Sequence, residues 1–280
     1  MSDNITPLAS LSLTHVYYNP NDPLSHLCAF LALVPQALCV VYATLLWSTR
    51  EAEVLLMFLG QLTCELINFV LKRLIKEERP KHVIITGGRG YGMPSSHAQF
   101  AVFWAIALGL FLMVRHRPPR SHIKKGQMQT EKAEKEGGGQ EPALVDVPRR
   151  YKEGGLQAVN AHLEAYSHTP WSLAQRGVVS LAAGVLAVLV AWSRIYLGYH
   201  TPKQVLAGSA AGAVSAVAWF AVTYMLRETG LLAWALEFPV ARWLRIRDLV
   251  VEEDLCQAGW EKWEERRTLA LSKIKNKKTN

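Results

Sequence analysis

The apolar residues of this 280-residue chain are gathered into long blocks, whereas a soluble protein would spread them at the short periods of helices and strands. Four blocks contain no Lys, Arg, Asp or Glu, and a fifth is interrupted only by Glu65. Each approaches the roughly 20 residues that a helix needs to cross a bilayer. The pattern excludes a soluble enzyme and predicts an all-α, polytopic transmembrane helical bundle of about five spans. The blocks are residues 23–49, 54–71, 90–114, 177–193 and 204–226.

The blocks and the polar stretches between them divide the chain into four regions. Residues 1–114 are expected to hold spans one to three, and residues 177–226 to hold spans four and five. Residues 115–176 mix charges with three consecutive glycines and few large apolar side chains, so we expect a disordered cytosolic insertion. Residues 227–280 are expected to form an amphipathic, basic cytosolic tail. Within this tail, we expect residues 231–244 to form an interfacial helix and not a sixth span.

The net charge of +8 alone would permit a nucleic-acid partner. In a chain with these apolar blocks, however, basic residues are better explained as the flanks of membrane spans, so no nucleic acid is expected. Three of the four cysteines lie inside the blocks, and none has the paired spacing of a metal ligand, so no metal site is expected either.

Three polar clusters lie where spans begin or end, and each alone has an ordinary explanation as a basic membrane flank or a helix N-cap. The first runs from Lys72 to Arg79-Pro80, the second is Pro94-Ser95-Ser96-His97, and the third runs from Ser193-Arg194 to His200-Thr201. Ser96 with Gln99 and Thr201 with Gln204 fit capping boxes, which would open two helices at one face. Cations, two histidines and two helix N-termini on one side together suit phosphoryl transfer.

These three clusters resemble the signature motifs of the type 2 phosphatidic acid phosphatase superfamily. More narrowly, the stretch from Tyr91 to His97, the stretch from Ser193 to Thr201 and the late Ile246-Arg247-Asp248 resemble the dolichyldiphosphatase family, which the early Leu13-Thr14-His15-Val16 also fits. The resemblance implies a metal-independent enzyme without a cofactor, whose active site lies at one membrane face. Its substrate would be dolichyl diphosphate, which it would convert to dolichyl phosphate and inorganic phosphate, recycling the carrier lipid for N-linked glycosylation.

The resemblance also implies a role for each motif residue. His200 would be the nucleophile that forms a phosphohistidine, and His97 would protonate the leaving group and then activate water. Gln204 stands where the superfamily usually has an aspartate that orients the nucleophile. An amide could hold the ring without adding charge, or Gln204 could only complete the capping box of Thr201. The phosphoryl group would be held by Lys72, Arg79, Ser95, Ser96 and Arg194.

Two alternatives to this function remain at this stage: a phosphatase of another lipid, such as phosphatidate or a shorter polyprenyl diphosphate, and a non-catalytic lipid-binding membrane protein. The expected location is the endoplasmic reticulum membrane, where membrane lipids surround the spans. Of the 31 Lys and Arg residues, eight lie on the side of the motifs and 23 on the opposite side. Because basic residues favour the cytosolic side, the active site is expected to face the lumen.

Overall fold

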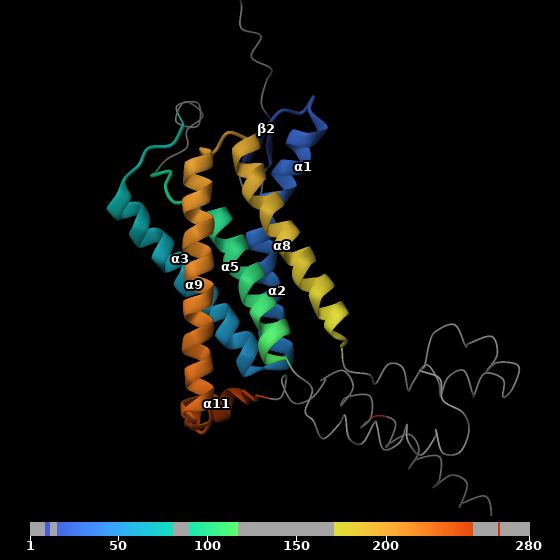
Figure 1. Cartoon of the computed structure of the whole chain (residues 1–280), viewed down its shortest axis with the longest axis vertical. Coiled ribbons are helices and arrows are strands. Elements are labelled where there is room, and N and C mark those ends of the chain that lie inside the picture. The colour runs from blue at the N-terminus through green and yellow to red at the C-terminus, as the bar shows by residue number, and fades with distance from the viewer. Residues whose placement is uncertain (1–8, 12–15, 81–89, 117–170, 249–262, 264–280) are drawn as a thin grey trace, which may run out of the picture. The chain divides into compact units, whose positions relative to one another are not determined.

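The computed structural model describes residues 9–11, 16–80, 90–116, 171–248 and 263. The chain divides into two compact units, and the helical bundle forms the unit that combines Met1–Arg115 with Ala174–Asp248 (Figure 1). Five helical stretches in it are long and apolar enough to cross a membrane, which confirms the predicted multi-pass, all-α bundle. Residues 117–170 of the predicted insertion, and all of the tail beyond residue 248 except Trp263, lie outside the described residues.

The first span is a broken helix rather than the single helix that we expected. It consists of α1 (Pro23–Leu31) and α2 (Val34–Thr49), with Ala32 and Leu33 between them. Proline has no N–H to donate and its ring crowds the preceding turn, so Pro35 cannot bond to the carbonyl of Leu31 and the helix breaks there. The break frees backbone carbonyl groups close to the motif end of the bundle.

A tight return joins the first span to the second. Helix α2 ends at Arg50 in the left-handed conformation (φ 55°), and α3 (Ala52–Ile75) begins two residues later. Helix α3 is longer than the predicted 54–71 and ends at Lys76, which is also left-handed (φ 53°). The chain then turns back toward the start of the third span.

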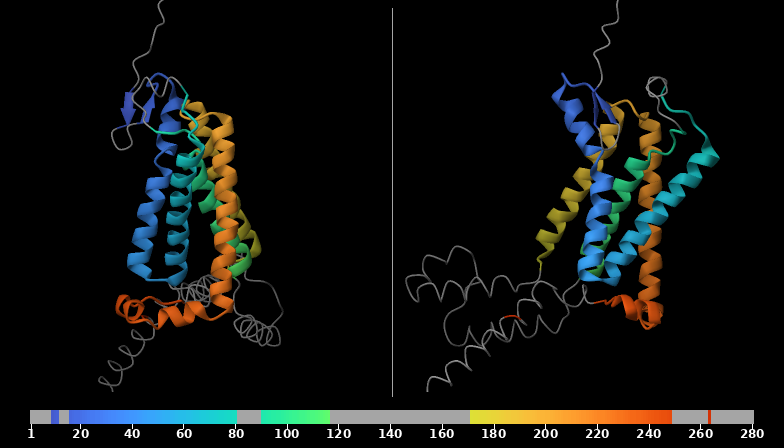
Figure 2. Two further views of the ribbon diagram at one scale, coloured as in Figure 1. Left: turned by 90° about the vertical axis from the view of Figure 1, so that its left-hand side faces the viewer. Right: turned by 180° about the vertical axis from the view of Figure 1, so that it is seen from behind.

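The third span is the central helix of the bundle and packs against α2, α3 and α9 (Figure 2). It comprises α5 (Ser96–Leu110) and a turn of π-helix, η1 (Phe111–Arg115). Helix α9 (Pro202–Glu228) lies against it so closely that a Cβ atom on Gly208 would stand 2.5 Å from the carbonyl oxygen of Ser95. A Cβ atom on Gly212 would likewise stand 2.4 Å from the carbonyl oxygen of Gln99. This G-x-x-x-G pair therefore packs two helices within one chain.

The fourth span, α8 (Leu173–Tyr196), also uses small residues for packing. Ala183 and Ala187 form one buried cluster with Ala101 and Ala105 of α5. Helix α8 begins four residues before the predicted span, and it carries Arg194 in its last turn. The alanine spacing of four residues thus sets one face of α8 against the central helix.

Two short helices follow the fifth span in place of one interfacial helix. They are α10 (Leu231–Leu236) and α11 (Pro239–Leu244), separated at Glu237 and Phe238 because Pro239 opens a new helix. Trp234 is 62% exposed and Trp243 80% exposed, as suits a segment at a membrane–water interface. Figure 2 shows both helices folded across the end of α9.

The late Ile246-Arg247-Asp248 stretch anchors the chain after these helices. The backbone N–H of Ala52 donates to the carbonyl of Arg247 (2.7 Å), and the Arg247 side chain pairs with buried Glu51 (2.8 Å). Asp248 accepts from Nη1 and Nη2, the two terminal guanidinium nitrogens of Arg227, at the end of α9 (2.5 and 2.9 Å). This stretch, which resembles the dolichyldiphosphatase family, thus lies at the end of the bundle opposite the three motifs of the candidate site.

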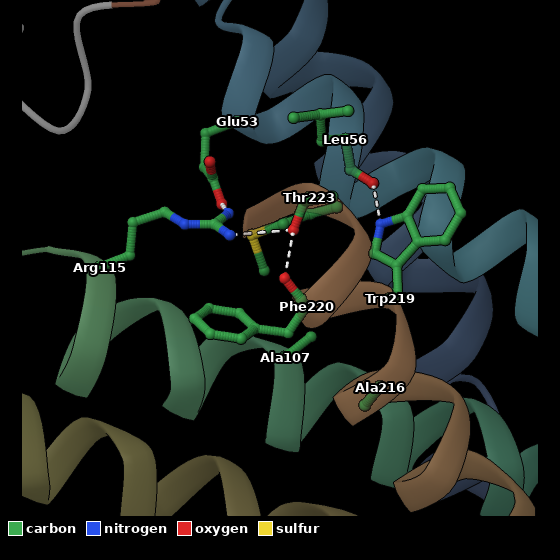
Figure 3. A pocket seen from close by; sticks show the side chains of 9 residues that line it. Glu53, Leu56, Ala107, Arg115, Ala216, Trp219, Phe220 and Thr223 are labelled. Atoms are coloured by element: carbon green, nitrogen blue, oxygen red, sulfur yellow. Dashed lines mark hydrogen bonds and ion pairs between the residues drawn. The ribbon is translucent and has the colours of Figure 1, made fainter. Parts of the chain in front are cut away.

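A buried ion cluster lies at that same end of the bundle, and Figure 3 shows two of its members, Glu53 and Arg115. The two carboxylate oxygens of Glu53 pair with Arg115 (2.5 Å) and Arg227 (2.6 Å), and Arg115 also donates to the hydroxyl of Thr223 (2.9 Å). Glu53, Arg115 and Thr223 line a small pocket together with Trp219, whose indole N–H donates to the carbonyl of Leu56 (2.8 Å). The cluster ties α3, the end of the third span and α9 together.

A small antiparallel hairpin precedes the first span, which the sequence pattern did not predict. Its strands are β1 (Ala9–Leu11) and β2 (Val16–Tyr18), with Val16 paired to Leu11. Val16 packs with Ala29 and Ala32 of the first span, close to Tyr199 of the third motif. The hairpin therefore covers the motif end of the bundle.

Candidate active site

The three sequence motifs come together because successive spans alternate in direction. Helices α3 and α8 end, and helices α5 and α9 begin, at one end of the bundle (Figures 1 and 2). The backbone N–H of Ser95 donates to the carbonyl of Gln204 (3.1 Å), and that of Gly92 donates to the carbonyl of Glu77 (2.7 Å). The segments of all three motifs are therefore in direct backbone or side-chain contact.

Three cations predicted to bind phosphate converge on this end. Arg194 is only 3% exposed, and its guanidinium group lies 4.5 Å from the ring centroid of Tyr199. Arg79 lies within electrostatic range of Arg194, and Lys72 within electrostatic range of Arg79. Burial lowers the pKa of Arg79. Three converging positive charges in a partly buried site favour an anionic ligand.

His200 lies among these positive charges, and its side chain is only 4% exposed. A tight turn after α8 places it there, with Gly198 in the left-handed conformation (φ 69°) and the N–H groups of Tyr199 and His200 both directed at the carbonyl of Arg194. Burial, reinforced by the charges of Arg194 and Arg79, lowers the pKa of His200 from 6.5 to about 3. The ring is therefore neutral at physiological pH, and a neutral imidazole is the form that can act as a nucleophile.

The sequence left two roles open for Gln204, capping the helix with Thr201 and orienting the ring of His200, and the structure shows the contacts of both. Its backbone N–H donates to the hydroxyl of Thr201 (3.3 Å), and its side-chain oxygen accepts from the backbone N–H of Thr201 (3.3 Å), which completes the predicted capping box. The same oxygen also lies 3.3 Å from Nδ1 of His200. Capping the helix and holding the histidine are thus compatible in one conformation.

Two glutamates to which the sequence did not point, Glu77 and Glu78, accept hydrogen bonds from the side-chain nitrogen of Gln204. Its side-chain nitrogen donates to Oε1 of Glu77 (3.0 Å) and to the backbone carbonyl of Glu78 (2.9 Å). Glu77 also pairs with Lys203 (3.0 Å), and these contacts lower its pKa. The only available sequence signal was the presence of acidic residues inside an otherwise basic cluster.

His97 stands in the first turn of α5, within electrostatic range of Arg194, His200 and Lys72. Its Nε2 atom lies 3.2 Å from the carbonyl oxygen of Ala32, which the break in the first span has freed. A carbonyl oxygen can only accept, so Nε2 carries a proton and Nδ1 is the nitrogen that can exchange one. No sequence motif pointed to Ala32, because the contact uses its backbone.

The N-terminus of α5 departs from the prediction. Ser95, not Ser96, is the N-cap residue, and the predicted capping box of Ser96 and Gln99 is absent. Gln99 is fully buried and instead bonds to the carbonyl of Cys64 (2.8 Å) and to the side chain of Asn68 (2.7 Å). The buried amide of Gln99 is thus satisfied by partners on α3 and not at the end of its own helix. The first N–H groups of α5 therefore have no side-chain cap.

Several buried polar atoms of this site have no hydrogen-bond partner among the described residues. They are Nε of Arg79, Nε and Nη1 of Arg194, and the hydroxyl of Ser95. Unsatisfied buried polar groups are costly and tend to mark functional positions. All of these atoms can donate hydrogen bonds, so they suit the oxygens of a phosphate group.

The segment before α2 forms a wall of the site. The hydroxyl of Tyr199 accepts from the backbone N–H of Tyr17 (2.8 Å), and the hydroxyl of Tyr196 donates to Asp22 (2.7 Å), which lowers the pKa of Asp22. Within the described ranges, no group of three or more His, Cys, Asp or Glu side chains could hold a metal ion.

Comparison with known proteins gives the chain its relatives. The PAP2 superfamily matches residues 53–228. A Neurospora crassa protein with a dolichyldiphosphatase name is 61% identical over 271 residues, which cover 95% of each chain. Human Dolichyldiphosphatase 1 is 33% identical over 242 residues, 85% of this chain and 81% of its own.

One solved structure is also similar: the transmembrane PAP2-type phosphatidylglycerolphosphate phosphatase of Bacillus subtilis. It is 21% identical, with a TM-score of 0.44, over 72% of this chain and 77% of its own. The PAP2 match extends over more than half of the chain, and the relatives are similar over most of their own length. The chain therefore belongs to the PAP2 superfamily and, within it, to the dolichyldiphosphatase family.

Proposed function

We propose that this protein is a hydrolase that converts dolichyl diphosphate to dolichyl phosphate and inorganic phosphate without a metal ion. The substrate class is taken from the names of its relatives. The observation that carries the chemistry is a set of buried donors on Arg79, Arg194 and Ser95 beside neutral His200, which have no partner among the residues that the structure describes. Such donors can hold the outer phosphoryl group while the histidine attacks it.

In the first step, the Nε2 lone pair of His200 attacks the outer phosphorus atom. The new Nε2–P bond replaces the P–O bond to dolichyl phosphate. His97, which carries a second proton on Nδ1 once the anionic diphosphate is bound beside it, gives that proton to the departing oxygen. Arg79, Arg194 and Lys72 bind the phosphoryl oxygens, together with Ser95, Ser96 and the uncapped N–H groups of α5.

In the second step, water attacks the phosphorus atom of the phosphohistidine. His97, now neutral, takes a proton from the water through Nδ1, while its Nε2–H group continues to donate to the carbonyl of Ala32. The Nε2–P bond breaks, inorganic phosphate leaves and His200 returns to its neutral form. Each histidine thus ends the cycle in its starting protonation state.

The proposed location is the endoplasmic reticulum membrane, with the active site on the luminal face and the product recycled for protein N-glycosylation. The charge distribution supports this orientation, because the predicted topology assigns 23 of the 31 Lys and Arg residues to the side opposite the motifs. A glycosylation acceptor placed within residues 130–140 should stay unmodified in cells, whereas its glycosylation would reverse the orientation.

The substrate can be tested with purified protein in detergent and EDTA, offered dolichyl diphosphate, a shorter polyprenyl diphosphate and phosphatidate. We expect phosphate release from dolichyl diphosphate to be fastest, and His200→Ala to abolish it. Labelled outer phosphate should become bound to the protein in an acid-labile, alkali-stable form, as a phosphohistidine is. Faster release from another lipid would reassign the substrate, and binding without release from any lipid would indicate a non-catalytic lipid-binding protein.

A further inference from the structure

The side chain of Gln204 can have only one orientation in this site. The backbone N–H of Thr201 can only donate, and it faces the side-chain oxygen of Gln204. The backbone carbonyl of Glu78 can only accept, and it faces the side-chain nitrogen. These two main-chain partners fix which atom is oxygen and which is nitrogen, independently of any histidine.

This orientation determines the tautomer of His200. Because the oxygen of Gln204 faces Nδ1 at 3.3 Å, Nδ1 must carry the proton of the neutral ring. The lone pair then resides on Nε2, the nitrogen that attacks phosphorus in the proposed function. Gln204 can therefore orient the nucleophile, but its amide has no charge to stabilise the cationic ring that phosphorylation creates.

A negative charge nevertheless lies on the other side of the same amide. Oε1 of Glu77 accepts from the side-chain nitrogen of Gln204 at 3.0 Å. A charged acceptor polarises the amide and makes its oxygen a stronger acceptor toward Nδ1. Glu77, Gln204 and His200 thus form one continuous chain of hydrogen bonds.

We propose that Glu77 is a positioning residue for His200, whose carboxylate acts through the Gln204 amide to stabilise the ring as it becomes cationic. This inference rests on the proposed function only in taking His200 as the nucleophile. In this proposal the two residues act together: the amide of Gln204 sets the tautomer of His200, and the carboxylate of Glu77 supplies the negative charge. Glu77 does not touch the substrate in this account.

The competing role for Glu77 is a surface ion pair with Lys203. The nitrogen of Lys203 lies 3.0 Å from Oε2 of Glu77, but its side chain is 72% exposed. Exposed pairs of this kind contribute little to stability. Lys203→Met removes this pair while leaving the contact between Glu77 and Gln204, so it is the matched control for every variant of Glu77.

The test is a double-mutant cycle on the full-length protein in detergent, with the first-turnover rate measured per folded molecule. Glu77→Gln keeps the shape of the side chain and removes its charge, and should slow phosphoenzyme formation about tenfold with little change in KM. Glu77→Asp, which keeps the charge, should fall between this variant and the wild type. Lys203→Met should match the wild type within about twofold.

The second arm of the cycle places a carboxylate at position 204. Gln204→Glu sets two carboxylates against each other, so one of them holds a proton more tightly, and activity should be low at neutral pH and recover as the pH falls. In this background Glu77→Gln should raise the rate, although it lowers the rate of the wild type. A surface ion pair would not produce this reversal of sign.

The pH dependence must be compared within this set of variants, because other groups also face His200. They are Arg194 of α8, Arg79 after α3, Lys72 of α3 and His97 of α5. All four are unchanged in every variant of the cycle. A difference in profile between Gln204→Glu with and without Glu77→Gln therefore reports on the pair of residues at 77 and 204.

A spectroscopic readout separates this inference from the proposed function. With ¹⁵N-labelled histidine, and His200→Asn to assign the signal, the wild type should show a protonated Nδ1 on His200. Glu77→Gln should move that proton upfield because its hydrogen bond weakens, while Lys203→Met should not. These shifts are expected even if every lipid substrate fails. A wild-type rate and an unmoved proton in folded Glu77→Gln would overturn the proposal.

Discussion

At the residue scale, burial and charge give the site its chemistry. His200 is almost fully buried and lies near Arg194, Arg79 and Lys72, so protonating it would add a fourth positive charge to a buried site. The same cations that hold a phosphoryl group therefore keep the nucleophile in its neutral form. Binding and activation are two consequences of one arrangement of charge.

The low pKa of His200 predicts how stability depends on pH. Between 6.5 and about 3, the unfolded chain binds a proton at this residue and the folded protein does not. Unfolding is then favoured as the pH falls, with a slope of about 1.4 kcal/mol per pH unit for one proton. The free energy of unfolding of the wild type should fall below pH 6.5 more steeply than that of His200→Asn. Equal slopes in detergent melting experiments would contradict this environment for the ring.

At the element scale, the break in the first span is what brings a main-chain acceptor to His97. A continuous helix would use the carbonyl of Ala32 internally, but Pro35 prevents the helix from continuing through this point. Pro35, which is far in the sequence from the three motifs, therefore leaves the backbone carbonyl of Ala32 free to contact His97.

Pro35→Ala should let α1 and α2 form one continuous helix, in which the carbonyl of Ala32 accepts a helical hydrogen bond and no longer contacts His97. Because a proline inside a helix costs about 3 kcal/mol, the variant should be no less stable than the wild type. Its turnover should nevertheless fall about tenfold, since the proton donor is no longer held in place. Pro23→Ala is the matched control, because a proline in the first turn of α1 disturbs no helical bond. Full turnover of folded Pro35→Ala would refute a role for Ala32.

Glycines on α9 set the distance between the second and third motifs. Gly208→Ala would place a Cβ atom 2.5 Å from the carbonyl oxygen of Ser95, which is backbone and cannot swing aside. We expect a loss of about 1–3 kcal/mol in stability, together with reduced turnover in the molecules that fold. Gly184→Ala on α8, where a Cβ atom would meet nothing within 4 Å, should have neither effect. Thermal melting and turnover of the two variants, measured side by side, provide the comparison.

The sequence predicted the elements better than it predicted their contacts. Five blocks with at most one charged residue each identify five spans because lipid excludes charge along a whole helix. The break at Ala32 was missed, since one proline in an apolar block looks tolerable until its neighbours are known. Gln99 was assigned to a cap, but a buried amide bonds wherever partners lie in three dimensions. Glu77 was missed because a charge near a membrane span is usually a solvated flank.

At the scale of the whole molecule, the two ends of the bundle have different tasks. One end gathers Lys72, Arg79, His97, Arg194 and His200, whereas the other is closed by the ion cluster of Glu53, Arg115 and Arg227. Buried charges of this kind are strongly destabilising when a partner is removed. The predicted insertion leaves the bundle at the closed end, directly after Arg115, and α8 returns there with Arg176, which donates to the carbonyl of Leu112 (3.2 Å).

This separation predicts that residues 118–168 are dispensable for catalysis. A short Gly/Ser linker in their place keeps both Arg115 and Arg176, and loop length changes the closure entropy only slowly. The shortened protein should therefore melt close to the wild type and turn over at its rate. The same linker combined with Arg115→Leu should lose about 3 kcal/mol, because Glu53 keeps only one of its two cationic partners. Its turnover per folded molecule should still be normal, since the cluster lies at the opposite end from His200. A shortened protein that folds and enters the membrane but does not turn over would give the insertion a catalytic role.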